Sequence, residues 1–154
     1  MSSYNKIIKI LLEKNISISI AESFTGGLLT KIFIDNPGIS KIFNMGIVAY
    51  SNKSKSLILK IPINTIKKYG AVSKEVSILM SKNLSKISKS DLCISTTGIA
   101  GPTGGSRIKP IGLIYISITS LNKTHTFKKI FKGKRSLIQK KAIEFCFEKI
   151  QKLI

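Results

Sequence analysis

Apolar and polar positions follow two periods along this chain, one typical of helices and one typical of strands. A period of 3.6 residues predicts a helix over 3–14, and alternating serine and isoleucine predict a strand over 16–21. Helical spacing returns over 25–35, and the breaker DNPG at 35–38 ends it. The first strand therefore runs through a polar turn directly into a helix.

The same two patterns continue to the C-terminus. Alternating and continuous apolar runs predict further strands at 46–51, 91–98, 111–119 and 124–131, the last two as a hairpin. Helices are expected at about 52–59, in a short turn near 63–70, after Ser73, and at 134–152. Asn52 and Ser73 are the expected N-caps. The helix after Ser73 should bury one stripe: Val76, Leu79, Met80, Leu84 and Ile87.

Helices and strands alternate early and a hairpin follows late. This order predicts a single three-layer α/β/α domain over residues 1–154, with a mixed, mostly parallel sheet. Ligands of such sheets bind outside the carboxyl ends of the strands. Ser23, Tyr50 and Thr97 follow or end three of the predicted strands, so we expect them to converge on one edge.

The formal net charge is +19, which raises the question of a polyanionic partner. Of the 26 basic residues only Arg107 and Arg135 are arginines, and the lysines are spread without a long run. Aromatic residues make up 7% and tryptophan is absent, so the interleaved aromatic and basic residues of nucleic-acid binders are missing. We therefore expect a solvated basic surface that steers a small anionic substrate and binds no specific nucleic acid.

The two cysteines and the apolar runs indicate the compartment. Cys93 and Cys146 form no CxxC motif, which suits buried thiols in a reducing cytoplasm. The first 15 residues are interrupted by charges, so we expect an amphipathic helix there and no signal peptide. No apolar run approaches the roughly 18 residues of a membrane span, and no membrane association is expected.

Three segments carry groups that can do chemistry. The turn at 22–27 holds Glu22 and two hydroxyls at the start of a helix, where Glu22 either orients the turn or caps the helix. The glycine-rich loop at 97–105 offers backbone N–H groups to an anion, although a tight turn alone would also use glycine. Lys53 and Lys55 stand near the positive end of a helix, which disfavours their protons, or they simply begin a surface helix.

Elimination narrows the choice of mechanism. His125 is the only histidine, and no cluster of His, Cys, Asp or Glu has the spacing of a metal site. If the chain is a hydrolase, a serine with a lysine base is what remains. A lysine base needs its pKa lowered by ~3 units, because an ordinary lysine titrates near ~10.4.

Four segments appear in the order AESFTGG, GIVAYSNKSK, GAVSKEV and TGIAGPTGG. Together they resemble the C-terminal domain of the competence/damage-inducible protein CinA, over about residues 5 to 150. The resemblance implies hydrolysis of the carboxamide of nicotinamide mononucleotide to nicotinate mononucleotide and ammonia, without metal or cofactor. It also implies self-association as a homodimer or larger homo-oligomer. The larger relatives carry an extra N-terminal domain, for which we expect no room here.

The same resemblance assigns roles to single residues. Ser23 corresponds to the catalytic serine, Lys55 to the catalytic lysine, and Tyr50 to the tyrosine of that motif. Thr97 and Arg135 are the expected contacts to the substrate, Arg135 to its phosphate. The two glycine-rich segments complete the expected substrate-binding set, which also includes Thr25, Gly26, Gly27, Gly98, Gly101, Gly104 and Gly105.

One residue departs from the family pattern. Phe24 stands where the family usually has cysteine, beside the expected nucleophile. A ring at this position either reshapes the pocket of a working enzyme or marks a catalytically weak interaction module. A basic nucleic-acid-binding protein is the remaining and less favoured alternative.

Overall fold

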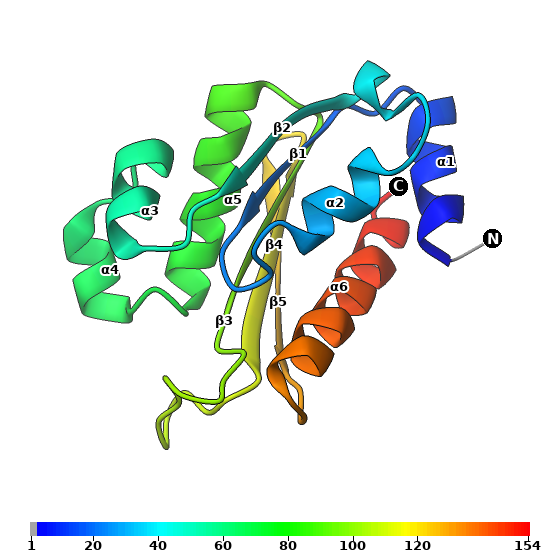
Figure 1. Cartoon of the computed structure of the whole chain (residues 1–154). Helices are drawn as coiled ribbons and strands as arrows, with labels where there is room; N and C mark the ends of the chain where they lie inside the picture. The colour runs from blue at the N-terminus through cyan, green and yellow to red at the C-terminus, as the bar shows by residue number, and fades with distance from the viewer. Residues whose placement is uncertain (1–2) are drawn as a thin grey trace.

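The computed structural model describes residues 3–154 and shows one sheet between two layers of helices (Figure 1). The helices are α1 (Ser3–Glu13), α2 (Leu28–Ile34), α3 (Asn52–Leu59), α4 (Ile63–Tyr69), α5 (Lys74–Ser88) and α6 (Arg135–Gln151). The strands are β1 (Ile18–Glu22), β2 (Phe43–Val48), β3 (Leu92–Gly98), β4 (Leu113–Ser120) and β5 (Lys123–Ile130), and a 3₁₀ turn, η1 (Ile39–Lys41), precedes β2.

The sheet has the strand order β2-β1-β3-β4-β5. Strand β1 pairs in parallel with both β2 and β3. Strand β4 is antiparallel to β3, and β5 is antiparallel to β4, so four of the five described strands run in the same direction. The expected mixed, mostly parallel sheet is confirmed, including its late hairpin.

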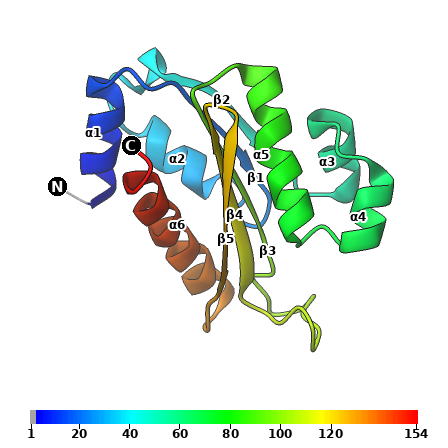
Figure 2. The ribbon, with the colours of Figure 1, turned by 180° about the vertical axis from the view of Figure 1, so that it is seen from behind.

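Each face of the sheet carries its own helical layer and its own apolar core. Helices α1, α2 and α6 cover one face, and α3, α4 and α5 lie on the other, as the view from behind also shows (Figure 2). Cys146 belongs to the first core and Cys93 to the second, and burial raises the pKa of both thiols. The expected α/β/α layering is therefore correct.

The borders of the elements around the first turn differ from the sequence expectation. Helix α2 begins at Leu28 and not at residue 25, because Gly26 and Gly27 have φ angles of 61° and 97°, which no helix contains. Strand β2 covers 43–48 instead of 46–51. The Ala49 N–H still donates to the Glu22 carbonyl of β1 at 2.8 Å, and the chain then leads into α3.

The N-cap predicted for α3 is wrong by one residue. Ser51 has extended backbone angles, and its Oγ accepts a hydrogen bond from the N–H of Ser54 at 3.0 Å. Asn52, the expected cap, is the first helical residue. The cap of α5 is Ser73, as expected, with Oγ accepting from the Val76 N–H at 3.2 Å.

The stripe of α5 that faces the sheet is partly polar. Ile87, expected inside, is 43% exposed, whereas Ser77 and Ser81 are fully buried. Ser77 Oγ pairs with Ser117 Oγ at 2.8 Å, and Ser81 Oγ pairs with Thr119 Oγ1 at 2.8 Å. Buried hydroxyls need such partners, and a pattern that counts serine as polar does not predict them inside.

A membrane-spanning helix was not expected. Within residues 3–154, no helix combines the length and the apolar composition that a membrane span requires.

Candidate active site

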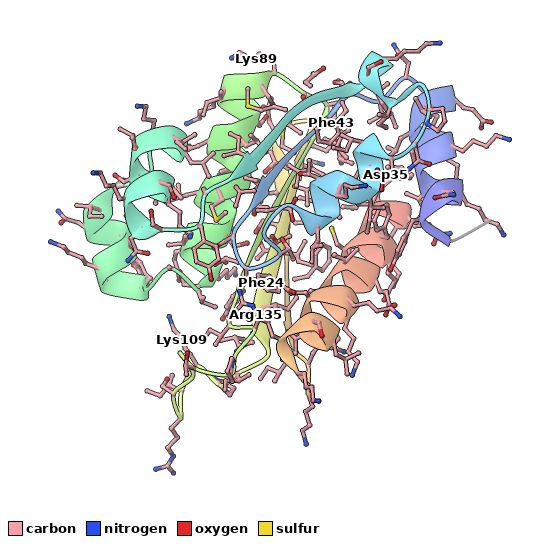
Figure 3. The ribbon with its side chains drawn as sticks, in the orientation of Figure 1. Phe24, Asp35, Phe43, Lys89, Lys109 and Arg135 are labelled. Atoms are coloured by element: carbon pink, nitrogen blue, oxygen red, sulfur yellow. The ribbon has the colours of Figure 1, made fainter. Side chains whose placement is uncertain are left out.

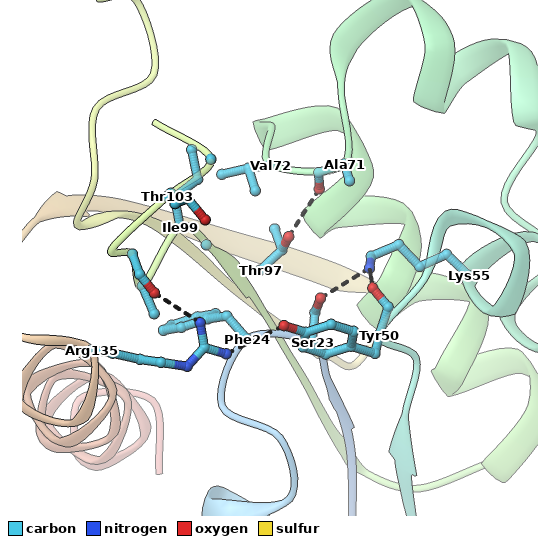
Figure 4. Close-up of a pocket in the computed structure, with 14 residues that line it drawn as sticks. Ser23, Phe24, Tyr50, Lys55, Ala71, Val72, Thr97, Ile99, Thr103 and Arg135 are labelled. Atoms are coloured by element: carbon cyan, nitrogen blue, oxygen red, sulfur yellow. Dashed lines mark hydrogen bonds between the residues drawn. The ribbon is translucent and has the colours of Figure 1, made fainter. Parts of the chain in front are cut away.

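A cavity of about 290 Å³ lies at the carboxyl ends of β1 and β3 and beyond the end of β2 (Figure 4). The polar groups that follow the three strands meet there, so the expected convergence is confirmed. The lining residues are Ser23, Phe24, Tyr50, Lys55, Ala71, Val72, Thr97, Gly98, Ile99, Ala100, Gly101, Thr103, Gly104 and Arg135.

Lys55 enters the cavity from the first turn of α3, and only 1% of its surface is exposed. Its Nζ lies 2.9 Å from Ser23 Oγ, 2.8 Å from the Ala49 carbonyl oxygen and 2.9 Å from the Tyr50 carbonyl oxygen. A neutral amine has two protons and one lone pair. If the two carbonyls accept both protons, the lone pair is directed at the serine hydroxyl.

Burial lowers the pKa of Lys55 from its ordinary value to about 8. The physical cause is desolvation of the ammonium by burial. At pH 7 roughly a tenth of such amines are neutral, compared with about one in 2,500 for an ordinary lysine. Lys53, the alternative base, has an exposed side chain.

The turn that carries Ser23 is fixed by Glu22, which is fully buried at the end of β1. Its carboxylate accepts hydrogen bonds from three backbone N–H groups: Gly27 at 3.1 Å, Leu29 at 3.0 Å and Thr30 at 2.7 Å. These are donors at the beginning of α2 that the helix itself leaves free. Of the two roles left open for Glu22, it therefore caps the helix, and the cap holds the turn.

The glycine N–H groups of this turn already donate hydrogen bonds within the protein. The Gly26 N–H donates to the Ser23 carbonyl at 3.1 Å, and the Gly27 N–H donates to Glu22. Neither glycine lines the cavity, nor do Thr25 and Gly105. Thr25 Oγ1 lies beneath the turn, 2.8 Å from Thr96 Oγ1. The turn uses the N–H groups of Gly26 and Gly27 and the hydroxyl of Thr25, and Gly105 lies outside the cavity lining, so the substrate contacts expected from these residues stay predictions.

The loop after β3 forms the opposite wall. Thr97 Oγ1 donates to the Ala71 carbonyl at 2.9 Å, and Gly98, Gly101 and Gly104 line the cavity as expected. A Cβ on Gly98 would lie 3.0 Å from the Phe24 ring and 2.7 Å from Ile114. Glycine is therefore required where the loop leaves the sheet.

Arg135, the first residue of α6, reaches across the open side of the cavity (Figures 3 and 4). Its Nη1 donates to the Gly101 carbonyl at 3.0 Å, and its Nη2 donates to the Tyr50 hydroxyl at 3.3 Å. Tyr50 thus contributes its carbonyl to Lys55 and its hydroxyl to Arg135. The lining contains the cations of Lys55 and Arg135 and no carboxylate, which suits an anionic ligand.

Phe24 is only 3% exposed and belongs to the apolar core between the sheet and α6. Its ring lines the cavity without separating Ser23 from Lys55.

Sequence reasoning missed Val72 and Thr103 in the lining, and it missed Gln139, which contacts the turn from α6. Spacing alone carries no signal for these contacts, because each crosses between distant elements.

Comparison with known proteins agrees with this architecture. The family model described as CinA C-terminal domain matches residues 2–154. A CinA-like protein of Fusobacterium nucleatum subsp. nucleatum is 45% identical over 142 residues, and one of Fervidobacterium nodosum is 38% identical over 149 residues. These matches cover 92% and 97% of this chain.

The chain spans about a third of the length of these curated relatives, 34% and 36% respectively. Among solved structures, the competence/damage inducible protein CihA from Agrobacterium tumefaciens is similar with a TM-score of 0.93 and 28% identity. That match covers 98% of this chain and 93% of the other. Fold, motif order and sequence identity lead to one assignment: the chain belongs to the CinA C-terminal domain family.

Proposed function

We propose that this chain is an amidohydrolase that converts nicotinamide mononucleotide to nicotinate mononucleotide and ammonia. The observation that carries the proposal is the 2.9 Å contact between Lys55 Nζ and Ser23 Oγ inside a cationic cavity. A hydroxyl beside a buried amine is a nucleophile with its base in place. The family resemblance supplies the choice of substrate.

In the first half of the reaction, the neutral amine of Lys55 takes the proton of Ser23. Ser23 Oγ forms a bond to the carboxamide carbon, and the carbonyl electron pair moves onto oxygen. When that pair returns, the C–N bond breaks and the ammonium of Lys55 protonates the leaving nitrogen. Ammonia leaves, and the nicotinoyl group remains as an ester on Ser23.

The second half repeats these steps with water. Lys55, neutral again, takes a proton from water, and the hydroxyl adds to the ester carbon. Collapse breaks the bond to Ser23 Oγ, which regains its proton from Lys55. The carboxylic acid then gives its remaining proton to solvent and leaves as the carboxylate. The Ala49 and Tyr50 carbonyls keep the amine in the same orientation through both halves. Lys55 therefore carries each proton that moves between Ser23, the leaving nitrogen and the attacking water.

The cavity also supports a nucleotide as the substrate. Arg135 stands at the open side, and no carboxylate within residues 3–154 pairs with it. A guanidinium binds phosphate through two N–H groups at once. We propose that Arg135 binds the phosphate while Thr97 and the loop glycines line the ribose and pyridine portions. Tyr50 holds Arg135 in place through its hydroxyl.

Release of ammonia from nicotinamide mononucleotide by the purified protein tests the proposal. We expect turnover by the wild type, loss of turnover in Ser23→Ala, and near wild-type turnover in Lys53→Ala, whose side chain is exposed. A folded wild type that releases no ammonia from this substrate would contradict the amidohydrolase and favour the interaction module.

Self-association and a cytoplasmic location remain part of the proposal. The family resemblance supports a homodimer or larger homo-oligomer. Size-exclusion chromatography with light scattering measures the mass of the particle in solution. A monomer across the accessible concentration range would contradict this part without affecting the chemistry.

A further inference from the structure

Helix α6 sends two side chains, one turn apart, to opposite walls of the cavity. Arg135 reaches the loop after β3, and Gln139 reaches the turn that carries Ser23. Gln139 Nε2 donates to the Phe24 carbonyl oxygen at 2.7 Å. Within residues 3–154, no other side chain is seen to donate to a backbone carbonyl of the segment 23–27.

Most backbone N–H groups of this turn are occupied. The Ser23 N–H donates to the Thr96 carbonyl at 3.0 Å, and those of Gly26 and Gly27 are bonded as described above. Within the segment 23–27, only the backbone N–H groups of Phe24 and Thr25 make no hydrogen bond to another described residue. These two donors therefore stay available beside the nucleophile.

The bond from Gln139 determines where one of these donors points. The peptide between Phe24 and Thr25 is planar and trans, so its C=O and N–H point in opposite directions. Holding the carbonyl against α6 directs the Thr25 N–H away from α6. When a tight turn begins at a serine, the backbone N–H of the second residue after the serine lies on the same side as the serine hydroxyl. The Gly26 N–H bond to Ser23 defines such a turn.

We propose that the N–H groups of Phe24 and Thr25 bind the oxyanion and that Gln139 is the positioning residue that fixes the peptide carrying the Thr25 N–H. The proposal rests on the serine chemistry described above. When Ser23 Oγ bonds to the carboxamide carbon, the electron pair on oxygen is stabilised by these two donors. Gln139 touches neither substrate nor Ser23, and it acts only through the Phe24 carbonyl.

A covalent adduct tests the donors without nicotinamide mononucleotide. With a fluorophosphonate, Ser23 Oγ bonds to phosphorus, fluoride leaves, and Lys55 takes the serine proton. The phosphoryl oxygen then occupies the oxyanion position. In ¹⁵N-labelled protein, the amide protons of Phe24 and Thr25 should move downfield on adduct formation. Those of Gly26 and Gly27, already bonded, are the internal control.

Two outcomes of this measurement would overturn the proposal. One is an adduct in which the Phe24 and Thr25 amides do not move, or move no more than the glycine amides. The other is a folded protein whose Ser23 forms no adduct, because a formed oxyanion site accelerates this reaction.

Gln139→Met tests the positioning role, because it keeps the length of the side chain and removes the donor. We expect kcat for ammonia release and the rate of phosphonylation to fall by about 10²-fold, the usual effect of losing one oxyanion donor. KM and the midpoint of the pH profile should not move, because Gln139 contacts neither Lys55 nor the substrate. Gln139→Lys, which restores an N–H donor, should recover most of the rate.

Lys140→Met is the matched control, since Lys140 is exposed and next to Gln139 on α6. Wild-type rates in Gln139→Met, or equal losses in Gln139→Lys and Lys140→Met, would contradict the positioning role. The adduct separates this inference from the proposed function. If the wild type hydrolyses no nicotinamide mononucleotide while Ser23 still phosphonylates in a Gln139-dependent way, the substrate is wrong and the oxyanion site stands.

Discussion

Lys55 Nζ and Ser23 Oγ lie 2.9 Å apart although 32 residues separate them in the chain. The contact joins the turn after β1 to the first turn of α3, and both segments begin where parallel strands end. Parallel pairing of β1 and β2 thus brings nucleophile and base together. The two carbonyls that bind Lys55 belong to the link between β2 and α3, so the same short link also orients the amine.

The first prediction concerns pH. Because burial lowers the pKa of Lys55 to about 8, the neutral amine increases as pH rises through that value. We expect kcat/KM for ammonia release to rise about tenfold per pH unit below pH 8 and to level off above it. Lys55→Arg should be nearly inactive at every pH, since a guanidinium stays protonated. A Lys55→Arg variant with most of its turnover would refute the serine–lysine mechanism.

The second prediction concerns the anionic part of the substrate. Removing the guanidinium in Arg135→Ala should raise KM for nicotinamide mononucleotide by about tenfold or more, from the loss of charge-assisted hydrogen bonds. KM for nicotinamide riboside, which lacks the phosphate, should change little. Steady-state kinetics on both compounds measure the difference. An equal rise in KM for both compounds would show that Arg135 supports the cavity through Tyr50 and Gly101 instead.

The third prediction concerns Phe24. Replacing a ring that is 3% exposed by cysteine leaves a cavity in the core, and Phe24→Cys should lower the free energy of unfolding by about 3 kcal/mol. Turnover should be kept or raised, because the ring does not lie between Ser23 and Lys55. Urea unfolding measures the stability, with Ile108→Cys at an 89% exposed position as the control. Unchanged stability would mean that the ring contributes little to packing.

The fourth prediction concerns the buried carboxylate of Glu22. In Glu22→Gln one of the two oxygens becomes an NH₂ group, which faces a backbone N–H instead of accepting from it. We expect a loss of about 2–3 kcal/mol in the free energy of unfolding. Glu13→Gln, which changes an exposed carboxylate, should have almost no effect. Equal stability of the two variants would argue against the capping role.

The fifth prediction concerns the charge of +19. If the lysines form a solvated surface, nucleic acids should bind weakly and without sequence preference, with Kd no tighter than ~10⁻⁶ M at physiological salt. Fluorescence anisotropy with short duplexes and single strands of several sequences measures this. Nanomolar, sequence-dependent binding at that salt would restore the nucleic-acid alternative.

Periodicity along the chain determined the elements, because the period of apolar residues depends only on local backbone geometry. It predicted the strand–turn–helix around Ser23, the late hairpin and the layered fold. It also placed Ser23, Tyr50 and Thr97 at strand ends, where α/β sheets bind ligands. The order of the four motifs was enough to indicate the family.

Tertiary structure alone decided which groups act together. Lys55 is buried and Lys53 is exposed, a difference that comes from which face of α3 packs on α5 and the sheet. Glu22 finds its three N–H donors only once the glycines have turned the chain into α2. Gln139 meets the Phe24 carbonyl across 115 residues. Such contacts depend on how the layers stack, and burial, which lowers the pKa of Lys55, exists only after that stacking.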